Sequence, residues 1–509
     1  MTPSNIPELD SIDAVLFDVG DTLVHAATPG TPVSDLQVRL RDDVLADLHE
    51  LSRRGLRLGA VTDTATMSGD DVRVLLEPSG VAALLTVIVS SCDVGAPKPE
   101  PTSLIAALAD LGVDASRTLY IGDRVIDRDA AASAGAHFAF IDGTIATTIA
   151  RWIEEGAGPF AHATACVRAD ADAVERSDAQ EAARERLDAL AKPPGSLGRL
   201  EQIAVQLCGI AGSCPAPLPT PATIGVFAGD HGVHAEGVTA WPQEITAAMV
   251  ATMLSGRASI NALAATVGAT VRLIDVGVAT PLPDLPPDSA RRVRSGTRNL
   301  ATERAMTLAE ATRALDVGVL VARESVDAGA RCLVTGEMGI ANTTPSAALV
   351  AALTGRVAAD VTGRGAGADD EVLGRKISAI DTALSRHTPG DDPLEVLASL
   401  GGLEIAALVG FIVGGVALRV PVVVDGVIAD AALLVAERLV PGTTAGCIAG
   451  HRSTEPAATI ALDTLGLEPL LDLDLRLGEG TGAALALPLL DAAARLLTDV
   501  ATIAEITGG

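Results

Sequence analysis

Short apolar runs that end in loops rich in glycine and acidic residues restrict the fold of this sequence more than any other feature. Ala14–Phe17 is followed by D-V-G-D, Leu58–Val61 by Thr62-Asp63, and Ile224–Ala228 by G-D-H-G. Such runs are typical of strands buried inside an α/β sheet. The loops that leave the carboxyl ends of such strands line ligand sites, so we expect an α/β fold with functional residues in these loops.

The chain has 509 residues, more than one hydrophobic core usually supports, and therefore predicts at least two domains. We expect a first domain at residues 1–150 and a second at 171–509. We expect residues 151–170 to form a linker, because this segment passes from the end of a short predicted helix, Ala146–Glu155, through G-A-G-P-F to a mixed stretch.

A formal net charge of −28 argues against surfaces that bind nucleic acid or anionic lipid by bulk electrostatics. The six cysteines form no C-x-x-C pair, so neither a zinc site nor a disulfide framework is indicated. The first residues lack the pattern of a signal peptide, and the apolar run Ile405–Leu418 is interrupted by glycines and too short for a membrane span. We expect a cytoplasmic protein that acts on small molecules.

Four motifs of the first domain recur in a fixed order. They are D-V-G-D-T-L from Asp18, the strand end at Thr62, Lys98 within A-P-K-P-E-P, and I-G-D from Ile121 with Asp127 four residues after Asp123. Together they resemble the motifs of the haloacid dehalogenase superfamily of phosphohydrolases, over most of residues 11–140. The spacing between the motifs leaves room for single helices such as Val33–Arg54, so we expect a capless Rossmann-like domain.

This resemblance implies a carboxylate nucleophile at Asp18, a phosphate-binding hydroxyl at Thr62 and a charge-neutralising Lys98. It also implies Mg²⁺ bound by Asp18, the Gly20 carbonyl, Asp123 and Asp127, and oxygen atoms are the ligands that Mg²⁺ prefers. The sequence departs from the family at Gly20, because active phosphatases usually carry a second Asp there as a general acid. Phosphatase activity, phosphate binding and a scaffolding role all remain open.

Further glycine-rich loops follow predicted strands of the second domain. They are G-D-H-G from Gly229, G-E-M-G-I-A-N-T-T from Gly336, G-R-G-A-G from Gly363, and H-R-S-T-E from His451. Glycine-rich loops and helix N-termini bind phosphate through backbone N–H groups. The Asp230-His231 pair is compatible with catalysis, with ligand binding, or with a bracing role in its loop.

The stretch R-L-G-E-G-T-G, residues 476–482, places one carboxylate between glycines. Leu471–Leu477 alternates apolar and charged residues as a strand does, and Ala483–Leu497 is rich in helix formers. We therefore expect Glu479 in a tight turn at the ligand crevice, where it would act as the catalytic base. The alternative is a glycine-rich turn with a solvated glutamate.

K-P-P-G-S-L-G-R-L-E, A-G-D-H-G-V, G-E-M-G-I-A-N-T-T, V-V-D-G and R-L-G-E-G-T-G-A-A-L occur in this order over more than half of the chain. Together they look like the nicotinate-nucleotide:dimethylbenzimidazole phosphoribosyltransferase family. The resemblance implies an α/β fold with a parallel sheet, a homodimer, and no cofactor. It implies transfer of phosphoribose from nicotinate mononucleotide to 5,6-dimethylbenzimidazole, which gives nicotinate and α-ribazole 5′-phosphate for the lower ligand of cobalamin.

The resemblance also implies roles for single residues. Glu479 would be the general base, beside Gly478. The other implied substrate contacts are Glu337 and Gly339 near the ribose and nicotinate, Gly363, Gly365 and Lys376 near the phosphate, Ser453 in the nucleotide pocket, and Asp230, Trp241, Pro242 and Met249 beside the benzimidazole. Core packing is the alternative for Trp241, and helix capping is the alternative for Glu337.

Three interpretations of the whole chain remain. The leading one is a phosphoribosyltransferase with an attached phosphohydrolase-like domain. In the second, the first domain also dephosphorylates a phosphate ester such as α-ribazole 5′-phosphate. In the third, the first domain is a non-catalytic interaction module.

Overall fold

The computed structural model describes residues 12–507 except 26–37, 42, 65, 142, 155–162, 165–166, 168–173, 283–284, 366 and 388–391. The chain divides into two compact units, Met1–His162 and Ala163–Gly509. Most of the predicted linker 151–170 lies outside the described residues, and the predicted domain limits at 150 and 171 stay predictions.

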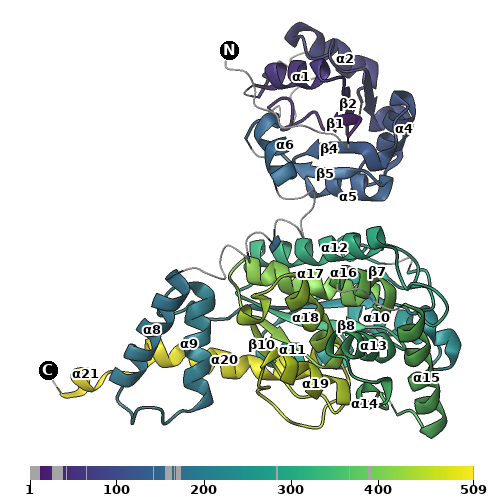
Figure 1. Ribbon diagram of the computed structural model, residues 1–509. Helices are drawn as coiled ribbons and strands as arrows, with labels where there is room; N and C mark the ends of the chain where they lie inside the picture. The colour runs from purple at the N-terminus through teal and green to yellow at the C-terminus, as the bar shows by residue number, and fades with distance from the viewer. Residues whose placement is uncertain are drawn as a thin grey trace. The chain divides into compact units, whose positions relative to one another are not determined.

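The first unit contains a parallel five-stranded sheet with the strand order β3-β2-β1-β4-β5 (Figure 1). Its strands are β1 (Ala14–Phe17), β2 (Arg57–Thr62), β3 (Val87–Ser90), β4 (Thr118–Gly122) and β5 (His137–Phe140). Its helices are α1 (Val44–Arg53), α2 (Gly69–Leu76), α3 (Ser91–Val94), α4 (Thr102–Leu111), α5 (Val125–Ala134) and α6 (Ile145–Glu154).

Both faces of this sheet are buried. On β1, Val15 and Phe17 belong to one hydrophobic cluster, whereas Ala14 and Leu16 belong to the cluster on the opposite face. Side chains alternate between the two faces of a strand, so an uninterrupted apolar run is what such a strand requires. The strand order reverses between β1 and β4, which brings the residues that follow these two strands together at one edge.

The second unit contains another parallel five-stranded sheet, in the order β10-β9-β8-β6-β7. Its strands are β6 (Ala222–Gly229), β7 (Thr270–Gly277), β8 (Cys332–Met338), β9 (Val422–Val424) and β10 (Cys447–Ala449). The predicted α/β class with parallel sheets is therefore confirmed for both units.

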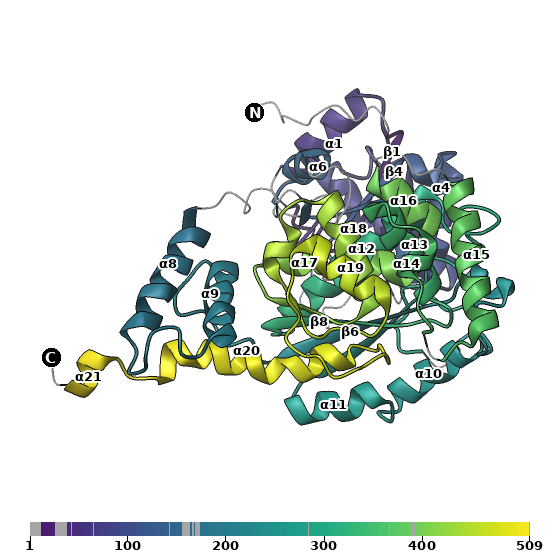
Figure 2. The ribbon, with the colours of Figure 1, turned by 60° about the horizontal axis from the view of Figure 1, so that its bottom comes forward.

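Helices cover both faces of the second sheet: α17 and α18 lie on one face, and α11 and α20 lie on the other (Figure 2). The helices of this unit are α8 (Val174–Ala189), α9 (Arg199–Ala211), α10 (Ile245–Leu254), α11 (Ser259–Val267), α12 (Leu308–Asp327), α13 (Thr343–Thr354), α14 (Ala358–Val361), α15 (Asp370–Arg386), α16 (Pro393–Leu400), α17 (Leu403–Ala417), α18 (Val427–Leu439), α19 (Pro456–Leu465), α20 (Thr481–Asp499) and α21 (Ile503–Thr507).

Helices α12 and α17 pack with their backbones in near contact. A Cβ atom built on Gly318 would lie 1.9 Å from the carbonyl oxygen of Ala407, and one built on Gly410 would lie 1.9 Å from that of Leu315. Only glycine allows backbones to approach so closely. Glycine at these two positions therefore allows α12 and α17 to pack this closely.

Two secondary-structure predictions are wrong. Leu471–Leu477 is not a strand: it has one isolated bridge, between Leu471 and His451, and Asp474 lies in the left-handed region at φ 55°. Leu473 and Leu477 are about half exposed, so the alternating pattern does not bury a face there. The helix predicted over Val33–Arg54 is too long: α1 begins at Val44, residues 38–41 and 43 are not helical, and residues 33–37 lie outside the described residues.

The predicted helix Ala483–Leu497 is confirmed as α20, Thr481–Asp499. By length and composition α20 is the one helix of the described residues that is apolar enough to cross a membrane. Many of its apolar side chains, Leu490 and Leu497 among them, belong to the core cluster that the helix shares with the sheet.

Candidate active sites

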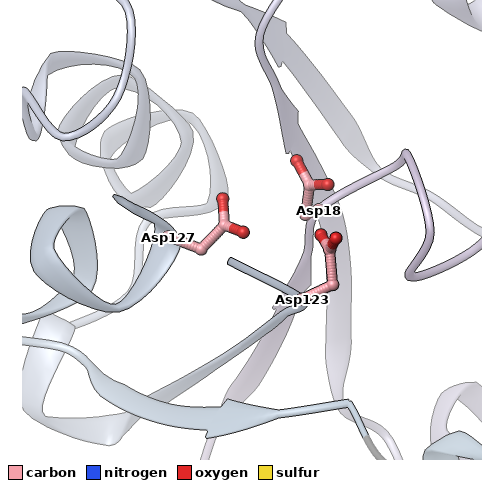
Figure 3. A group of neighbouring side chains, drawn as sticks. All are labelled: Asp18, Asp123 and Asp127. Atoms are coloured by element: carbon pink, nitrogen blue, oxygen red, sulfur yellow. The ribbon is translucent and has the colours of Figure 1, made fainter. Parts of the chain in front are cut away.

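Three carboxylates gather at the carboxyl edge of the first sheet (Figure 3). Asp18 follows β1, Asp123 follows β4, and Asp127 lies in the first turn of α5. One oxygen from each side chain lies within 4.8 Å of the others, and Oδ1 of Asp123 has no hydrogen-bond partner among the described residues. Three oxygen donors this close, one of them unsatisfied, fit a hard divalent cation such as Mg²⁺.

Lys98 is buried among these carboxylates. Its Nζ lies 2.5 Å from Oδ1 of Asp18, 2.5 Å from Oδ1 of Asp127 and 3.0 Å from the Tyr120 hydroxyl. Burial raises the pKa of Asp18, and the positive charge of Lys98 opposes that shift. Lys98 thus lies in direct contact with Asp18, as expected if the lysine neutralises charge beside a nucleophilic aspartate.

Thr62, the predicted phosphate ligand, ends β2 beside β1 and is nearly buried.

Asp21 is exposed, and its backbone lies in the left-handed region at φ 51°. A Cβ atom on Gly20 would instead have Oδ2 of Asp18 as its nearest described neighbour, at 4.0 Å. The position that faces the Asp18 carboxylate is therefore Gly20.

The second unit has a cavity of about 320 Å³ at the carboxyl ends of β8, β9 and β10. The residues predicted from the sequence that line this cavity are Trp241, Glu337, Gly339, Gly365, Lys376, Ser453 and Gly478. Ligand sites of parallel sheets lie at this edge. Segments separated by more than 200 residues in the sequence thus form one site.

Lys376 of α15 provides a buried positive charge in the cavity wall. Its Nζ donates to the Gly363 carbonyl at 2.8 Å and to Oγ1 of Thr343 at 3.0 Å. Burial lowers the pKa of Lys376, whereas the nearby Glu455 raises it. The backbone N–H of Gly365 donates to Glu455 at 2.7 Å, so the loop from Gly363, the lysine and Glu455 form one polar wall.

Glu337 lies near the end of β8 and is nearly buried. Burial raises its pKa to about 8, with Asp425 adding to the shift, while the backbone of Glu479 and the side chain of Asn342 donate hydrogen bonds to its carboxylate. Glu337 is a strand residue, so the helix-capping alternative is wrong. Its carboxyl group is held against the turn that carries Glu479.

The turn before α20 has three consecutive residues in the left-handed region: Gly478 at φ 88°, Glu479 at φ 63° and Gly480 at φ 89°. A Cβ atom on Gly478 would lie 2.2 Å from Oε1 of Glu337, and one on Gly480 would lie 3.0 Å from the Thr335 carbonyl. Glycine is required on both sides of Glu479 because L side chains avoid this conformation and no space is left for them.

Glu479 is 4% exposed, so it is not the solvated glutamate of the alternative interpretation. Its Oε2 accepts the backbone N–H of Ile260, in the first turn of α11, at 3.3 Å. Burial raises the pKa of Glu479, and the hydrogen bond from Ile260 opposes the shift. Glu479 is absent from the cavity lining, and its carboxylate points to α11, whereas its backbone contacts Glu337.

Two residues that contribute to the cavity stand in quoted motifs but were given no role from the sequence. Asp425 follows β9 and accepts the N–H groups of Gly480 at 3.2 Å and Ala483 at 2.9 Å. His451 follows β10, and its Nε2 lies 3.4 Å from Oδ1 of Asp425; burial alone would lower the pKa of His451, but Asp425 raises it. The available signal was the same as for Asp18, namely a polar residue directly after an apolar run.

The residues predicted beside the benzimidazole lie in different environments, some in the cavity wall and others outside it. Trp241 lines the cavity and is 50% exposed, so core packing is not its role. Asp230 is buried outside the cavity lining, and its Oδ2 accepts the N–H of Ala279 at 2.8 Å, which braces the loop after β7. Met249 of α10 is half-buried and packs against the core cluster rather than the cavity.

Next to Asp230, His231 forms a buried ion pair with Glu404, with 2.8 Å between Nε2 and Oε1. Burial alone would lower the pKa of His231, but the carboxylate of Glu404 raises it. A Cβ atom on Gly339 would lie 2.3 Å from the Gly229 carbonyl and 3.2 Å from Nε2 of His231. The ion pair thus lies directly behind the cavity floor.

The second unit combines a parallel α/β sheet, a buried lysine beside a glycine loop and a buried, glycine-flanked glutamate just before α20, which fits a phosphoribosyltransferase of the α/β class. Residues 172–507 match the model of a phosphoribosyltransferase family, and residues 30–141 match that of a haloacid dehalogenase-like hydrolase family. The second unit therefore has the fold of the transferase, and the first unit is a haloacid dehalogenase-like domain.

Individual relatives agree with this assignment. A nicotinate-nucleotide–dimethylbenzimidazole phosphoribosyltransferase of Salinispora tropica is 55% identical over 328 residues, covering 62% of this chain and 90% of the relative. One from Chloroflexus aurantiacus is 52% identical over 325 residues, covering 64% and 92%. The crystal structure of a Thermus thermophilus enzyme of that name has 46% identity and a TM-score of 0.62, covering 65% of this chain and 98% of the enzyme. The chain belongs to the nicotinate-nucleotide–dimethylbenzimidazole phosphoribosyltransferase family.

Proposed function

We propose that the second unit transfers phosphoribose from nicotinate mononucleotide to 5,6-dimethylbenzimidazole, giving nicotinate and α-ribazole 5′-phosphate. The observation that carries the proposal is the turn at Gly478–Gly480, which holds a buried carboxylate at the edge of a cavity that contains a buried lysine. The reaction needs no cofactor, because the pyridinium nitrogen of the donor is already an activated leaving group.

In this reaction a benzimidazole nitrogen forms the new bond to C1′ of the ribose. The bond from C1′ to nicotinate breaks, and its electron pair neutralises the pyridinium nitrogen. The second benzimidazole nitrogen must lose its proton, otherwise the product is a cation. Glu479 takes this proton, and its buried position makes it a stronger base than an exposed carboxylate.

The cavity suits the nucleotide half of the reaction. Lys376 binds the phosphate beside Gly365 in the cavity wall, and the Gly363 carbonyl holds the lysine in place. Glu337, Gly339 and Ser453 contact the ribose and nicotinate. Trp241 at the cavity mouth stacks on the acceptor, while Asp230 and Met249 support that side from behind.

The acceptor must lie on the opposite side of the ribose from nicotinate, because attack at C1′ inverts the β linkage to α. Glu479 points toward α11 and away from the cavity lining, which fits an acceptor bound between α11 and the ribose. We further propose that the protein works as a homodimer in the cytoplasm.

The test is incubation of the full chain with nicotinate mononucleotide and dimethylbenzimidazole, with products separated by mass. Ribazole phosphate formed by the parent, and lost in Glu479→Gln with nucleotide binding retained, is the expected result. Equal rates for the two folded proteins would refute the role of Glu479.

The first unit has a second candidate function, phosphoryl transfer to Asp18. It is favoured by the position of Lys98 between Asp18 and Asp127, with Asp123 beside them. Asp18, the Gly20 carbonyl, Asp123 and Asp127 would hold Mg²⁺, which neutralises phosphate charge when bound. Thr62 and Lys98 would contact the phosphate. Asp18-dependent release of phosphate in the presence of Mg²⁺ tests this candidate.

A further inference from the structure

Gly20 leaves an empty position opposite the Asp18 carboxylate. A Cβ atom built on Gly20 has one described neighbour within 4 Å, Oδ2 of Asp18 at 4.0 Å, once its chain neighbours are excluded. Oδ1 of the same carboxylate contacts Lys98. The backbone of Gly20 does not lie in the left-handed region, so residues with side chains fit there. Neither lack of space nor backbone conformation therefore requires glycine at this position.

Two of the other carboxylates near Asp18, Asp127 and Asp63, already contact basic groups or backbone N–H groups. Asp127 contacts Lys98 and accepts the N–H of Arg124 at 2.9 Å. Asp63 accepts the backbone N–H of Lys98 at 3.1 Å and lies 3.6 Å from Arg124. Asp123 is one of the three candidate cation ligands. Asp127 and Asp63 are thus engaged by basic groups, Asp123 belongs to the candidate cation ligands, and position 20 is the one whose Cβ atom would face Oδ2 of Asp18.

We propose that Gly20 restricts the first unit to phosphoryl donors whose leaving group departs without a proton, namely acyl phosphates, and that Asp18 retains the phosphoryl group as an aspartyl phosphate. This inference rests on the proposed phosphoryl transfer to Asp18. Alkyl phosphate esters are poor donors here, because an alkoxide leaving group must be protonated as it leaves. The ribazole phosphate made by the second unit is such an ester.

The reaction balances without an acid. A carboxylate oxygen of Asp18 bonds to phosphorus, and the bond from phosphorus to the acyl oxygen breaks with its electron pair on the departing carboxylate. In the second step a water molecule attacks phosphorus, releases phosphate, restores the Asp18 carboxylate and loses its proton to solvent. A carboxylate at position 20 would accept that proton, so without one the second step is slow and the aspartyl phosphate accumulates.

The experiment uses the full chain with Mg²⁺ and two probes, acetyl phosphate and ribose 5-phosphate. Mass spectrometry of the peptide that contains Asp18 measures the bound phosphoryl group, and phosphate release measures turnover. We expect a phosphoryl group on Asp18 from acetyl phosphate and almost no release from ribose 5-phosphate. Gly20→Asp should increase release from ribose 5-phosphate by ~10²–10⁴-fold and lower the steady-state aspartyl phosphate.

Gly20→Asn is the matched control, because its side chain has the same size but cannot exchange a proton; it should not gain ester hydrolysis. Asp18→Asn should abolish the label. If the parent releases phosphate from both probes equally well through Asp18, or if Gly20→Asn gains as much as Gly20→Asp, the role of Gly20 is refuted and phosphoryl transfer stands. If no variant is labelled or releases phosphate from either probe, phosphoryl transfer to Asp18 is itself wrong.

Discussion

The backbone N–H of Ile260 donates to Oε2 of Glu479 at 3.3 Å, although 219 residues separate them in the sequence. This contact fixes the carboxylate against the first turn of α11, while the glycines on either side hold its backbone in the left-handed region. A base held at a fixed angle transfers a proton faster than one that must first be oriented.

Glu479→Gln should lower kcat/KM of the transferase by ~10²–10⁴-fold, because glutamine keeps an oxygen for Ile260 but cannot take the azole proton. Steady-state kinetics with both substrates measure this loss. Glu371→Gln, on the exposed face of α15, is the control and should behave as the parent. A loss confined to KM, with kcat retained, would indicate binding rather than proton transfer.

Gly478→Ala should lower thermal stability and transferase activity much more than a typical glycine replacement does. The new methyl group would collide with Oε1 of Glu337, in addition to the strain of about 1–2 kcal/mol that the left-handed region imposes on alanine. Gly466→Ala, at φ 67° with nothing within 4 Å of its Cβ atom, isolates the strain alone. Thermal unfolding should give a lower Tm for Gly478→Ala than for Gly466→Ala. Of the two variants, Gly478→Ala alone should lose transferase activity. Equal stability and activity in the two variants would contradict the predicted collision.

Glu337 should make binding of the mononucleotide dependent on pH. Its pKa of about 8 keeps the carboxyl group neutral below that pH, and ionisation above it adds a negative charge to a cavity that receives an anionic ligand. KM for nicotinate mononucleotide should therefore rise above pH 8 in the parent and change much less in Glu337→Gln. Identical pH profiles of KM in both proteins would rule out ionisation of Glu337 as the cause.

Asp430 of α18 should weaken the fold as the pH rises. It is fully buried, neither oxygen has a hydrogen-bond partner in the described part of the chain, and burial raises its pKa well above that of an ordinary carboxyl group. The folded protein keeps a proton that the unfolded chain loses from about pH 4 upward, so stability falls with increasing pH at a limiting slope of about 1.4 kcal/mol per unit. Asp430→Asn should therefore gain stability over the parent progressively between pH 5 and pH 8, measured by denaturant unfolding. Asp463→Asn, an exposed change on α19, should give no such trend, and a constant difference for Asp430→Asn would disprove the assignment.

Residues that directly follow buried strands were predictable from the sequence, because the order of apolar run, acid and glycine is local. Asp18 and Asp123 were found in this way, and the structure brings them together. The partner of Glu479 in α11, and the contact of Asp425 with the first turn of α20, depend on segments far apart in the chain. The alternating pattern at Leu471–Leu477 misled for a related reason, since the segment forms one isolated bridge, at Leu471, and leaves Leu473 and Leu477 about half exposed.

At Gly318 and Gly410 the backbones of α12 and α17 face each other, with no side chain of either glycine to change rotamer. A single added methyl group at Gly318 or Gly410 would therefore push the two helices apart. Glu404 lies in the first turn of α17. The ion pair between Glu404 and His231 behind the cavity floor is therefore attached to a helix whose position is fixed by its close contact with α12.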